Sequence, residues 1–568
     1  MRANPTANGT ARPTDWHAVN WRQANRHVRN LRQRIFRAEQ AGDHQKVRSL
    51  QQLMLRSYSN TLLSVRRVTQ TNAGKNTAGV DKVVKTPTAR GKLVDQLMAY
   101  QPWRATPTRR VYIPKANGKL RPLGIPTVLD RCLQARVKNA LEPVWEARFE
   151  GSSYGFRPGR SCHDAIEKIY GLARPNGRKK WVVDADIKGA FDHISHTHLL
   201  EAIGLCPGRE LIKQWLKAGY MEDAVYHDTP TGTPQGGVIS PLLANIARHG
   251  MEAALGVVHN NWGRLTSNRA VVRYADDLVV FCASKPDAEA VITTLTKWLG
   301  QRGLTLSPEK TRIVHLTEGL DFLGFNVRHY KAPKTSRSGY KLLITPSKQA
   351  VKAMRAKLRA RWLHLRGSNG QAVVKELNPS IRGWANYHRT AVAKVVFQKL
   401  DNWMWQREVR YVKRTHPHKP WRWLKPRYWG KLNPARTDTW VFGDKPTGRY
   451  LLKFRWFTIE RQVLVKGCAS PDDPTLRAYG QVRERAQAKN LKPKHRAVAR
   501  HQNYVCRLCG MTLFNDEEIQ EHHSKPRKAG GTDDLSNRTL VHLYCQQQIH
   551  SGKIRPRDAA GELLLLGG

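Results

Sequence analysis

The chain has 568 residues, with 97 Lys or Arg against 44 Asp or Glu and a formal net charge of +53. Hydrophobic residues make up 40%, which excludes a disordered chain, and no apolar stretch approaches the length of a bilayer span. So large an excess of cations indicates a polyanionic partner, RNA or DNA above all, rather than a membrane surface.

The cellular location is predicted from the N-terminus and the cysteines. The segment MRANPTANGTARPT is basic and lacks the apolar core of a secretory signal. Five of the eight cysteines are scattered, as in proteins with reduced thiols. These features favour a cytoplasmic protein, and our expectation is the cytoplasm of a bacterium. An organellar location stays open, because a basic segment without acids also fits a transit peptide.

The first 90 residues predict a helical extension. Residues 20–68 indicate two amphipathic helices, because apolar residues recur there at helical spacing. These residues are Trp21, Val28, Leu31, Ile35, Val47, Leu50, Met54 and Leu62. Next, RRVYIPKANGKLRPLGIP (109–126) predicts a β-hairpin around Asn117-Gly118, with Lys115, Lys119 and Arg121 on it.

Two strand-forming segments carry carboxylates. In WVVDADI (181–187), Asp184 and Asp186 share one strand face, and VVRYADDLVV (271–280) predicts two short buried strands that meet at Asp276 and Asp277. If the strands are neighbours, Asp186, Asp276 and Asp277 converge. With no local basic partner, they would require divalent cations, and hard oxygen ligands favour two Mg²⁺ ions. The alternative is a polar hairpin turn with an unrelated surface Asp.

The rest of the chain divides into an α+β region and a basic helical region. TPTGTPQGGVISPLLANI (229–246) predicts a loop that leads into a helix near Ser240, and the chain turns helical from about residue 346. Residues 402–431 interleave five Trp and two Tyr with nine Lys or Arg. This pattern fits RNA binding by stacking and phosphate contact, or a core helix with Trp inside and Arg outside. The lack of a GxxxxGK[ST] loop argues against an NTP-hydrolysing motor.

The C-terminal cysteines predict a metal site. Cys506 and Cys509 form a CxxC pair, and His542 and Cys545 form an HxxC pair, which together have the spacing of a structural zinc site. Four protein ligands would leave no open position for catalysis.

The motifs, taken together and in order, resemble reverse transcriptases, specifically the kind encoded by group II introns. The matching segments are RRVYIPKANGKLRPLGIPT, YGFRPGRSCHDAI, DADIKGAFDHI, GTPQGGVISPLLANI, VRYADDLVVF, GLTLSPEKT and FLGF. The resemblance implies an α+β multidomain fold containing a right-hand polymerase. Its parts would be the N-terminal extension (1–90), fingers and palm with an antiparallel sheet (91–345), an α-helical thumb or domain X (346–430), a DNA-binding region (431–494) and an HNH endonuclease-like domain (495–568).

The resemblance also implies the roles of polymerase residues. Asp186, Asp276 and Asp277 would be the catalytic, Mg²⁺-binding triad, and FLGF (322–325) would support the primer end. The implied nucleotide-binding residues are Lys115 and Arg121 for the triphosphate, Phe191 as the gate against a 2′-OH, Gln235 in the pocket wall and Lys310 as a general acid near the pyrophosphate. Asp184 and Asp192 would support the site without binding metal.

ELNPSIRGWANYHR (376–389) resembles the maturase domain, called domain X. The family's members bind their own intron RNA in a ribonucleoprotein, assist splicing, copy the RNA into DNA with dNTPs, and insert it into a DNA target in retrohoming. Arg382, Lys394 and Lys399 would contact RNA phosphates, or else lie on a solvated face. A free-standing reverse transcriptase and a non-enzymatic splicing cofactor are the alternatives for the whole chain.

The region between the zinc arms resembles the HNH endonuclease motif, a ββα-metal fold. The pattern implies His523 as general base, His522 and His550 as ligands of one Mg²⁺ ion, and Asn537 as a brace of the loop. The chain departs from the pattern at Gln546, where the family has a histidine, and at Arg538, where it has a leucine. A neutral amide should weaken Mg²⁺ binding, so DNA cleavage stays open.

Overall fold

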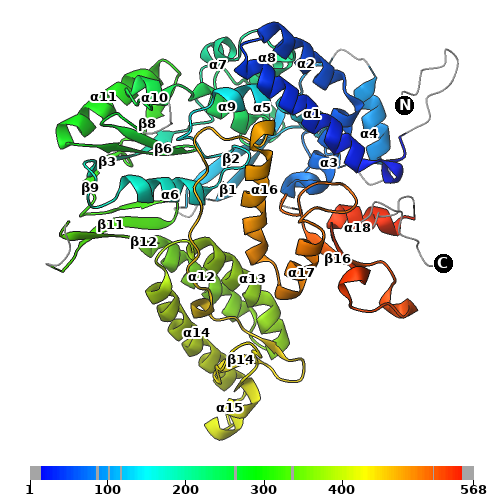
Figure 1. Cartoon of the computed structure of the whole chain (residues 1–568), viewed down its shortest axis with the longest axis vertical. Coiled ribbons are helices and arrows are strands. Elements are labelled where there is room, and N and C mark those ends of the chain that lie inside the picture. The colour runs from blue at the N-terminus through cyan, green and yellow to red at the C-terminus, as the bar shows by residue number, and fades with distance from the viewer. Residues whose placement is uncertain are drawn as a thin grey trace.

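The computed structural model describes residues 14–84, 89–99, 103–114, 118–260, 265–333, 338–515 and 517–552. Lys115, predicted to bind nucleotide, lies outside these residues. Figure 1 shows a sheet-containing part above a helical bundle, with the C-terminal segments beside the N-terminal helices.

Three helices, rather than the predicted two, follow one another over the first segment: α1 (Trp21–Gln40), α2 (His44–Arg56) and α3 (Tyr58–Arg66). The second predicted helix is interrupted at Ser57. Its backbone is extended, and its hydroxyl accepts a hydrogen bond from the backbone N–H of Asn60. Ser57 thus caps a new helix, and the spacing of apolar residues could not predict this cap. A fourth helix, α4 (Ala89–Met98), packs against α3.

The predicted hairpin is confirmed over its two arms, β1 (Thr108–Pro114) and β2 (Leu120–Ile125), which pair antiparallel. β1 also pairs in parallel with β4 (Tyr220–Glu222), and β5 (Val225–His227) closes the sheet in the order β2-β1-β4-β5.

A second sheet holds both acidic segments. Its order is β6-β7-β3-β8, and β9 also pairs with β3. The bounds are β3 (Trp181–Lys188), β6 (Ala270–Tyr274), β7 (Asp277–Cys282), β8 (Thr305–Leu306) and β9 (Arg312–His315). The two predicted strands around Asp276 and Asp277 are therefore confirmed as β6 and β7.

Both faces of this sheet are buried, which explains the apolar runs. Leu278 and Val280 of β7 enter one core with α5, α9 and α11, whereas Val279 and Phe281 enter another with α6. These helices are α5 (Val128–Arg148), α6 (Cys162–Leu172), α9 (Ser240–Ala247) and α11 (Lys285–Gly300). The shorter helices of this part are α7 (His196–Ile203), α8 (Arg209–Lys217) and α10 (Met251–Ala254). The helix predicted to open near Ser240 is confirmed as α9.

A three-stranded sheet leads from this part into the bundle. Its order is β10 (Leu320–Phe322), β11 (Phe325–Lys331), β12 (Tyr340–Pro346). The bundle comprises α12 (Lys348–His364), α13 (Gly370–His388), α14 (Lys394–Thr415) and α15 (Trp421–Tyr428), followed by β13 (Trp429–Gly430), β14 (Val441–Asp444) and β15 (Arg449–Tyr450). The prediction that the chain becomes helical from about residue 346 is thus confirmed.

The aromatic residues of the basic stretch divide between the two interpretations. Trp403, Tyr411, Tyr428 and Trp429 belong to the core of the bundle. Trp405 and Trp421, by contrast, keep 43% and 37% of their surface exposed. Helical spacing alone therefore could not tell the buried aromatic residues from the exposed ones.

The C-terminal part is fastened to distant segments by buried ion pairs. Arg32 of α1 lies 2.6 Å from Asp472, and Arg483 of α16 (Arg477–Arg485) lies 2.9 Å from the fully buried Asp164 of α6. After α17 (Pro493–His501), the strands β16 (Ile519–His523) and β17 (Arg538–His542) and the helix α18 (Leu543–His550) form a small ββα module.

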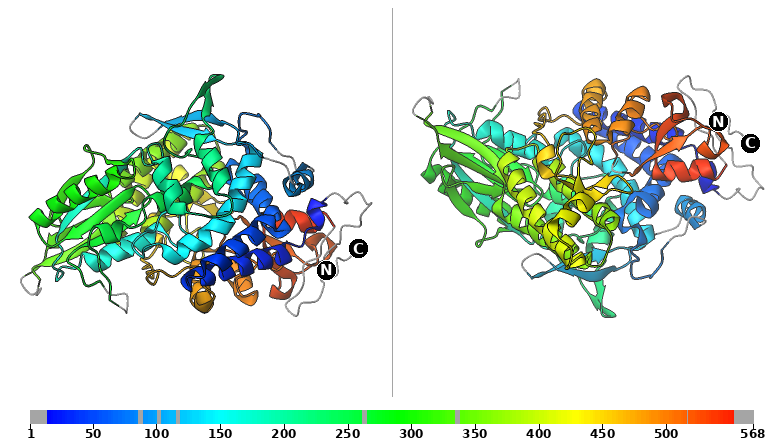
Figure 2. Two further views of the ribbon diagram at one scale, coloured as in Figure 1. Left: turned by 90° about the horizontal axis from the view of Figure 1, so that it is seen from above. Right: turned by 90° about the horizontal axis from the view of Figure 1, so that it is seen from below.

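This module packs on the N-terminal helices, as both views in Figure 2 show. Trp16 and Trp21 share a core with Leu540 and Ile549 of the module. The side-chain amide of Gln548 donates hydrogen bonds to the backbone carbonyls of His17 and Val19, at 2.8 and 2.9 Å. The first and last described segments therefore fold as one unit.

Candidate functional site

The predicted carboxylate cluster forms at the join of β3, β6 and β7. Asp186 and Asp277 are direct antiparallel partners, and Asp276 occupies the two-residue turn between Tyr274 and Asp277. Ala275 holds the turn with φ +56°. The three carboxylates thus come from neighbouring strands, as the alternation of apolar and acidic residues predicted.

The mutual repulsion of the carboxylates is visible in the pKa of Asp277, which rises to about 6. Removal from bulk water is the largest cause, and the charges of Asp186 and Asp276 follow. A divalent cation would relieve this repulsion. The donor set, three hard carboxylates on a rigid sheet edge, fits Mg²⁺.

Two cations contact the cluster, so the expectation that it has no basic partner is wrong. Lys310 Nζ lies 2.6 Å from Asp186 Oδ2, and this hydrogen bond raises the pKa of Lys310. Arg248 Nη1 lies 2.8 Å from Asp276 Oδ1. Both cations are remote in sequence, 124 and 28 residues from their partners, which is why local sequence did not reveal them.

Arg248 is a residue that sequence reasoning missed. Its side chain is fully buried at the end of α9, and it donates hydrogen bonds to the carbonyls of Ala244 and Ala275 as well as to Asp276. A second arginine, Arg273, is buried beside it, and burial lowers the pKa of Arg273 to about 9, with the charge of Arg248 contributing. The turn therefore sits on a buried cationic support.

The structure explains the glycine at the second position of the YGFRPG motif (154–159), which packs against the same turn. A Cβ at Gly155 would come within 2.3 Å of the backbone nitrogen of Ala275. No side chain fits there, so glycine allows residues 152–155 to run beside β6. Tyr154 N–H donates to the carbonyl of Arg273, and Arg273 N–H donates to that of Ser152, at 2.9 and 3.0 Å.

The loop that contains Pro234-Gln235-Gly236 hydrogen-bonds both to Phe191, the predicted sugar gate, and to the hairpin of β1 and β2. The carbonyl of Phe191 accepts a hydrogen bond from Thr233 N–H at 2.7 Å, and the carbonyl of Gln235 accepts one from Gly124 N–H at 2.8 Å. Phe191 is 9% exposed, with its ring against Phe156. Arg121 is exposed on β2.

Asp184 and Asp192, the two aspartates expected to support the triad, also have hydrogen-bond partners. Asp184 accepts hydrogen bonds from Arg312 on β9 at 2.9 and 3.0 Å, so its charge is already balanced. The carbonyl of Asp192 accepts a hydrogen bond from the Thr231 hydroxyl.

The FLGF segment forms a tight turn that the bundle holds. Phe322 pairs with Phe325, and the two residues between them, Leu323 and Gly324, have φ values of +49° and +79°. Tyr387, from the NYH end of α13, donates its hydroxyl hydrogen to the carbonyl of Leu323 at 2.8 Å and stacks on Phe325. The domain X motif is thus part of the support of this turn.

The predicted RNA contacts lie on the surface of the bundle. Arg382 on α13, and Lys394 and Lys399 on α14, are all exposed. Their position leaves them open to a phosphate backbone.

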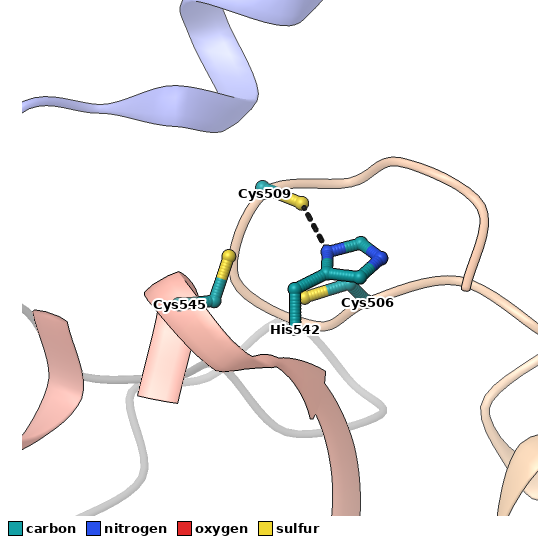
Figure 3. Close-up of side chains that lie close together, drawn as sticks. All are labelled: Cys506, Cys509, His542 and Cys545. Atoms are coloured by element: carbon teal, nitrogen blue, oxygen red, sulfur yellow. Dashed lines mark hydrogen bonds between the residues drawn. The ribbon is translucent and has the colours of Figure 1, made fainter. Parts of the chain in front are cut away.

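The four predicted zinc ligands come together (Figure 3). Cys506, Cys509, His542 and Cys545 are buried, with their ligand atoms within 4.8 Å of one another. His542 Nε2 lies 3.1 Å from the carbonyl of Thr512, and its Nδ1 lies 3.3 Å from Cys509 Sγ. An Nε2–H donated to Thr512 leaves Nδ1 free as a ligand, and three thiolates with one imidazole fit Zn²⁺.

Arg66 of α3 contacts this cluster from outside the module. Its Nη2 lies 3.5 Å from Cys545 Sγ and 3.2 Å from Glu517, and its guanidinium lies 4.7 Å from the ring centre of Trp21. Only 5% of Arg66 is exposed. A Zn²⁺ ion with three thiolates would carry a net negative charge, which Arg66 is placed to balance.

The histidines of the HNH-like segment line a pocket of about 420 Å³ beside the zinc cluster. The lining residues are Lys494, Glu521, His522, His523, Pro526, Arg527, Gln546 and His550. The rings of His522 and His550 lie 6.0 Å apart, and burial lowers the pKa of His522, which keeps the imidazole neutral as a metal ligand must be.

Asn537 occupies the position of a loop brace. Its Oδ1 accepts from Lys525 N–H at 2.7 Å, and its Nδ2 donates to the carbonyls of Thr532 and Lys525. His523 Nε2 lies 3.0 Å from Asp533. Gln546, which stands where the HNH pattern has a histidine, has its Nε2 3.0 Å from His550 Nε2. It therefore contacts a ring nitrogen of His550, one of the predicted metal ligands. Arg538 pairs with Glu521 across the two strands.

Four family models match the chain. They are described as N-terminal domain of reverse transcriptase (residues 16–97), reverse transcriptase (RNA-dependent DNA polymerase) (113–327), group II intron maturase-specific domain (351–429) and HNH endonuclease (506–552). The fold and the carboxylate cluster thus define a reverse transcriptase of the right-hand class, with an α+β palm and an HNH domain.

Curated relatives narrow the family. Protein YkfC of Escherichia coli is 36% identical over 318 residues, 49% of this chain and 82% of YkfC. Group II intron-encoded protein LtrA of Lactococcus lactis is 35% identical over 294 residues, 41% of this chain and 49% of LtrA. The chain belongs to the group II intron-encoded reverse transcriptases, although it aligns with only about half of LtrA.

A solved telomerase of Candida albicans in complex with telomeric RNA aligns with 55% of this chain and 59% of its own, at 14% identity and a TM-score of 0.32. That likeness is too low to bear on fold or activity. Within the described ranges, no helix has both the length and the apolarity that crossing a membrane requires.

Proposed function

We propose that this protein extends a DNA primer on an RNA template, using dNTPs and two Mg²⁺ ions, as the polymerase of a group II intron ribonucleoprotein. The single observation that carries the proposal is the convergence of Asp186, Asp276 and Asp277 at one sheet edge. Bound Mg²⁺ would stabilise the charge that develops on the attacking and leaving oxygens of the phosphoryl transfer.

The protein's own groups then have distinct tasks. Asp186 and Asp277 hold the metal-binding edge, and Arg248 fixes one oxygen of Asp276. Lys310 carries its proton on Nζ, hydrogen-bonded to Asp186, and would serve as the general acid that protonates the leaving pyrophosphate. Phe191 closes the sugar side of the pocket, where a ring would exclude a 2′-OH.

RNA binding is assigned to the thumb. Arg382, Lys394 and Lys399 contact phosphates, and domain X holds the intron RNA during splicing. Tyr387 couples this domain to the turn that supports the primer end. We place the complex in the bacterial cytoplasm, because YkfC and LtrA are both bacterial proteins, with an organelle as the alternative.

For the C-terminal module we propose a zinc-stabilised domain that binds the DNA target and cleaves it weakly. Zn²⁺ is held by Cys506, Cys509, His542 and Cys545 and supplies folding energy rather than chemistry. His523 serves as base and Asn537 as brace. His522 and His550 would hold one Mg²⁺ ion, which would polarise the scissile phosphate, and Gln546 would lower the affinity of that site.

The test is primer extension by Asp276→Asn. The variant should lose synthesis while keeping RNA binding, because only metal-binding charge is removed. Synthesis at the wild-type rate would refute the site. Glu309→Gln, at the residue before Lys310 in the sequence, serves as a control for loss of a carboxylate outside the triad, and it should extend normally.

Sequencing the RNA that copurifies from the native host separates the rival functions. A dominant intron that encloses this protein's gene supports the maturase assignment. A broad RNA mixture with active synthesis would indicate a free-standing enzyme, and bound intron without synthesis would indicate a splicing cofactor.

A further inference from the structure

Helix α15 and strand β14 lie at the end of the helical bundle that is remote from the palm sheet (Figure 1). These segments carry an exposed aromatic surface. Trp421, the first residue of α15, and Trp440, just before β14, keep 37% and 40% of their surface exposed. Their rings stack with an interplanar angle of 19° and centroids 6.4 Å apart. Lys425 Nζ lies 4.5 Å from the ring centre of Trp440. We call Trp421, Lys425 and Trp440 the tryptophan platform.

The platform is rigidly mounted. Trp421 also contacts the ring of Trp429, at 5.3 Å, and Trp429 is buried in the core of the bundle. Trp429 pairs with Phe442 across β13 and β14, which fixes the two segments that carry the exposed rings. Two large apolar rings are therefore held nearly parallel on the surface, and neither belongs to the buried core of the bundle.

The surroundings of the platform are strongly cationic. Residues 409–437 contain nine Lys or Arg and no Asp or Glu. The nearest acid in sequence to Trp440, Asp438, is paired with Arg455 and with the indole N–H of Trp456, each at 2.6 Å. Around α15, Lys419, Arg422, Lys425 and Arg427 are all exposed. This charge complements phosphate, not a protein surface of mixed sign.

We infer that the tryptophan platform is a binding site for an unpaired base of a single-stranded nucleic acid, with Lys425 and its neighbours on the adjoining phosphates. A base has an apolar face that can extend the Trp421–Trp440 stack, and stacking on aromatic rings tolerates every base. The platform lies at the end of the bundle that is remote from the sheet holding the carboxylate cluster (Figure 1). It deepens the proposed RNA partnership by naming an unpaired nucleotide as the group recognised.

The experiment is photocrosslinking of the full-length protein to a short oligonucleotide, with peptide mapping by mass spectrometry. The probes are a 4-thiouridine RNA and the corresponding 4-thiothymidine DNA of the same sequence, which distinguish the two sources of an unpaired base. Local mapping is needed because the net charge of +53 gives the whole protein a strong background affinity for nucleic acid.

Crosslinks should appear within residues 419–445 and fall roughly fivefold to a hundredfold in Trp421→Ala and Trp440→Ala, the range expected for loss of one stacked base. Trp421→Phe and Trp440→Phe should retain most of the crosslinking, because a ring remains. Trp405→Ala removes another exposed tryptophan, on α14, and should leave these crosslinks unchanged.

The inference is overturned if no crosslink maps to this segment, or if the alanine variants crosslink as well as the wild type. Competition by polyglutamate alone, with no effect of ring removal, would also overturn it and indicate an acidic protein partner. Thermal melting of each variant verifies folding. Because the readout needs no DNA synthesis, a preparation that fails in primer extension but crosslinks here rejects the proposed polymerase function and keeps the platform.

Discussion

Arg248 and Asp276 form an ion pair beneath the turn that carries two of the three carboxylates. The guanidinium is fully buried, and its Nη1 lies 2.8 Å from Asp276 Oδ1. The same side chain holds the carbonyl of Ala275. One buried cation thus fixes the backbone and the carboxylate of the turn at once, at the cost of a positive charge close to the proposed metal site.

Replacing that cation separates its two effects. Arg248→Leu should lower the rate of primer extension about 10- to 100-fold, because Asp276 loses its brace. It should also lower the Mg²⁺ concentration for half-maximal activity, because a nearby unit charge opposes metal binding by on the order of a few kcal/mol. The measurement is a Mg²⁺ titration of extension rate. Arg248→Lys, which keeps the charge, should leave the Mg²⁺ requirement unchanged. A slower enzyme that needs more Mg²⁺ would indicate general damage to the fold.

The raised pKa of Asp277 predicts competition between protons and Mg²⁺. The folded value of about 6 exceeds the ordinary value of 3.8, so the ionised form is disfavoured in the metal-free fold. Activity should fall as the pH drops through about 6, and excess Mg²⁺ should move this midpoint lower because metal favours the ionised carboxylate. Without metal, the same shift makes the group's contribution to stability largest below pH 3.8 and smallest above pH 6. A midpoint that is independent of Mg²⁺ would rule out Asp277 as its source.

Phe191 is predicted to set the choice of sugar. Phe191→Ala should raise the incorporation of rNTPs relative to dNTPs about 10- to 100-fold, because the ring that would clash with a 2′-OH is removed. Single-nucleotide extension with matched rATP and dATP measures the ratio. Phe156→Ala removes the neighbouring ring and is the matched control, with an unchanged ratio expected. Equal discrimination in Phe191→Ala would exclude the gate.

Zinc is predicted to hold the C-terminal module against α3 through Arg66. Removing the metal with a chelator should increase hydrogen exchange in α3 as well as in the module. Arg66→Met should still bind one zinc but destabilise the fold by about 3 kcal/mol, as loss of one partner of a buried ion pair does. Its α3 should exchange as fast as in the zinc-free wild type. Unchanged exchange in α3 after chelation would show that the module folds independently of it.

Gln546 is predicted to limit the nuclease. Gln546→His places an imidazole on the face of α18 that already carries His550, so nicking of plasmid DNA with Mg²⁺ should rise at least tenfold. The double variant Gln546→His with His523→Ala should return to background, since the base is lost. If the single variant gains nothing, the pocket is a DNA-binding surface without a metal role.

Sequence reasoning succeeded where a local pattern determines the structure. Alternation of apolar and acidic residues located Asp186 on one strand and Asp276 with Asp277 at a hairpin turn, and the CxxC and HxxC spacing located four residues that cluster as a metal site would. It failed where interacting residues are remote in sequence, or where a single capping residue decides where a helix begins. Arg248 reaches Asp276 from the end of another helix, Ser57 divides a predicted helix by one hydroxyl, and no periodicity reveals that Arg66 contacts Cys545.

The packing of the last segment on the first has a consequence for synthesis on the ribosome. Asn25 donates a hydrogen bond to the carbonyl of Cys509, 484 residues later. At about 5–20 residues per second, the N-terminal part of the core around Trp16 and Trp21 emerges roughly 25–100 s before the C-terminal residues that share it. The earliest-made part of the protein is therefore the last to be completed.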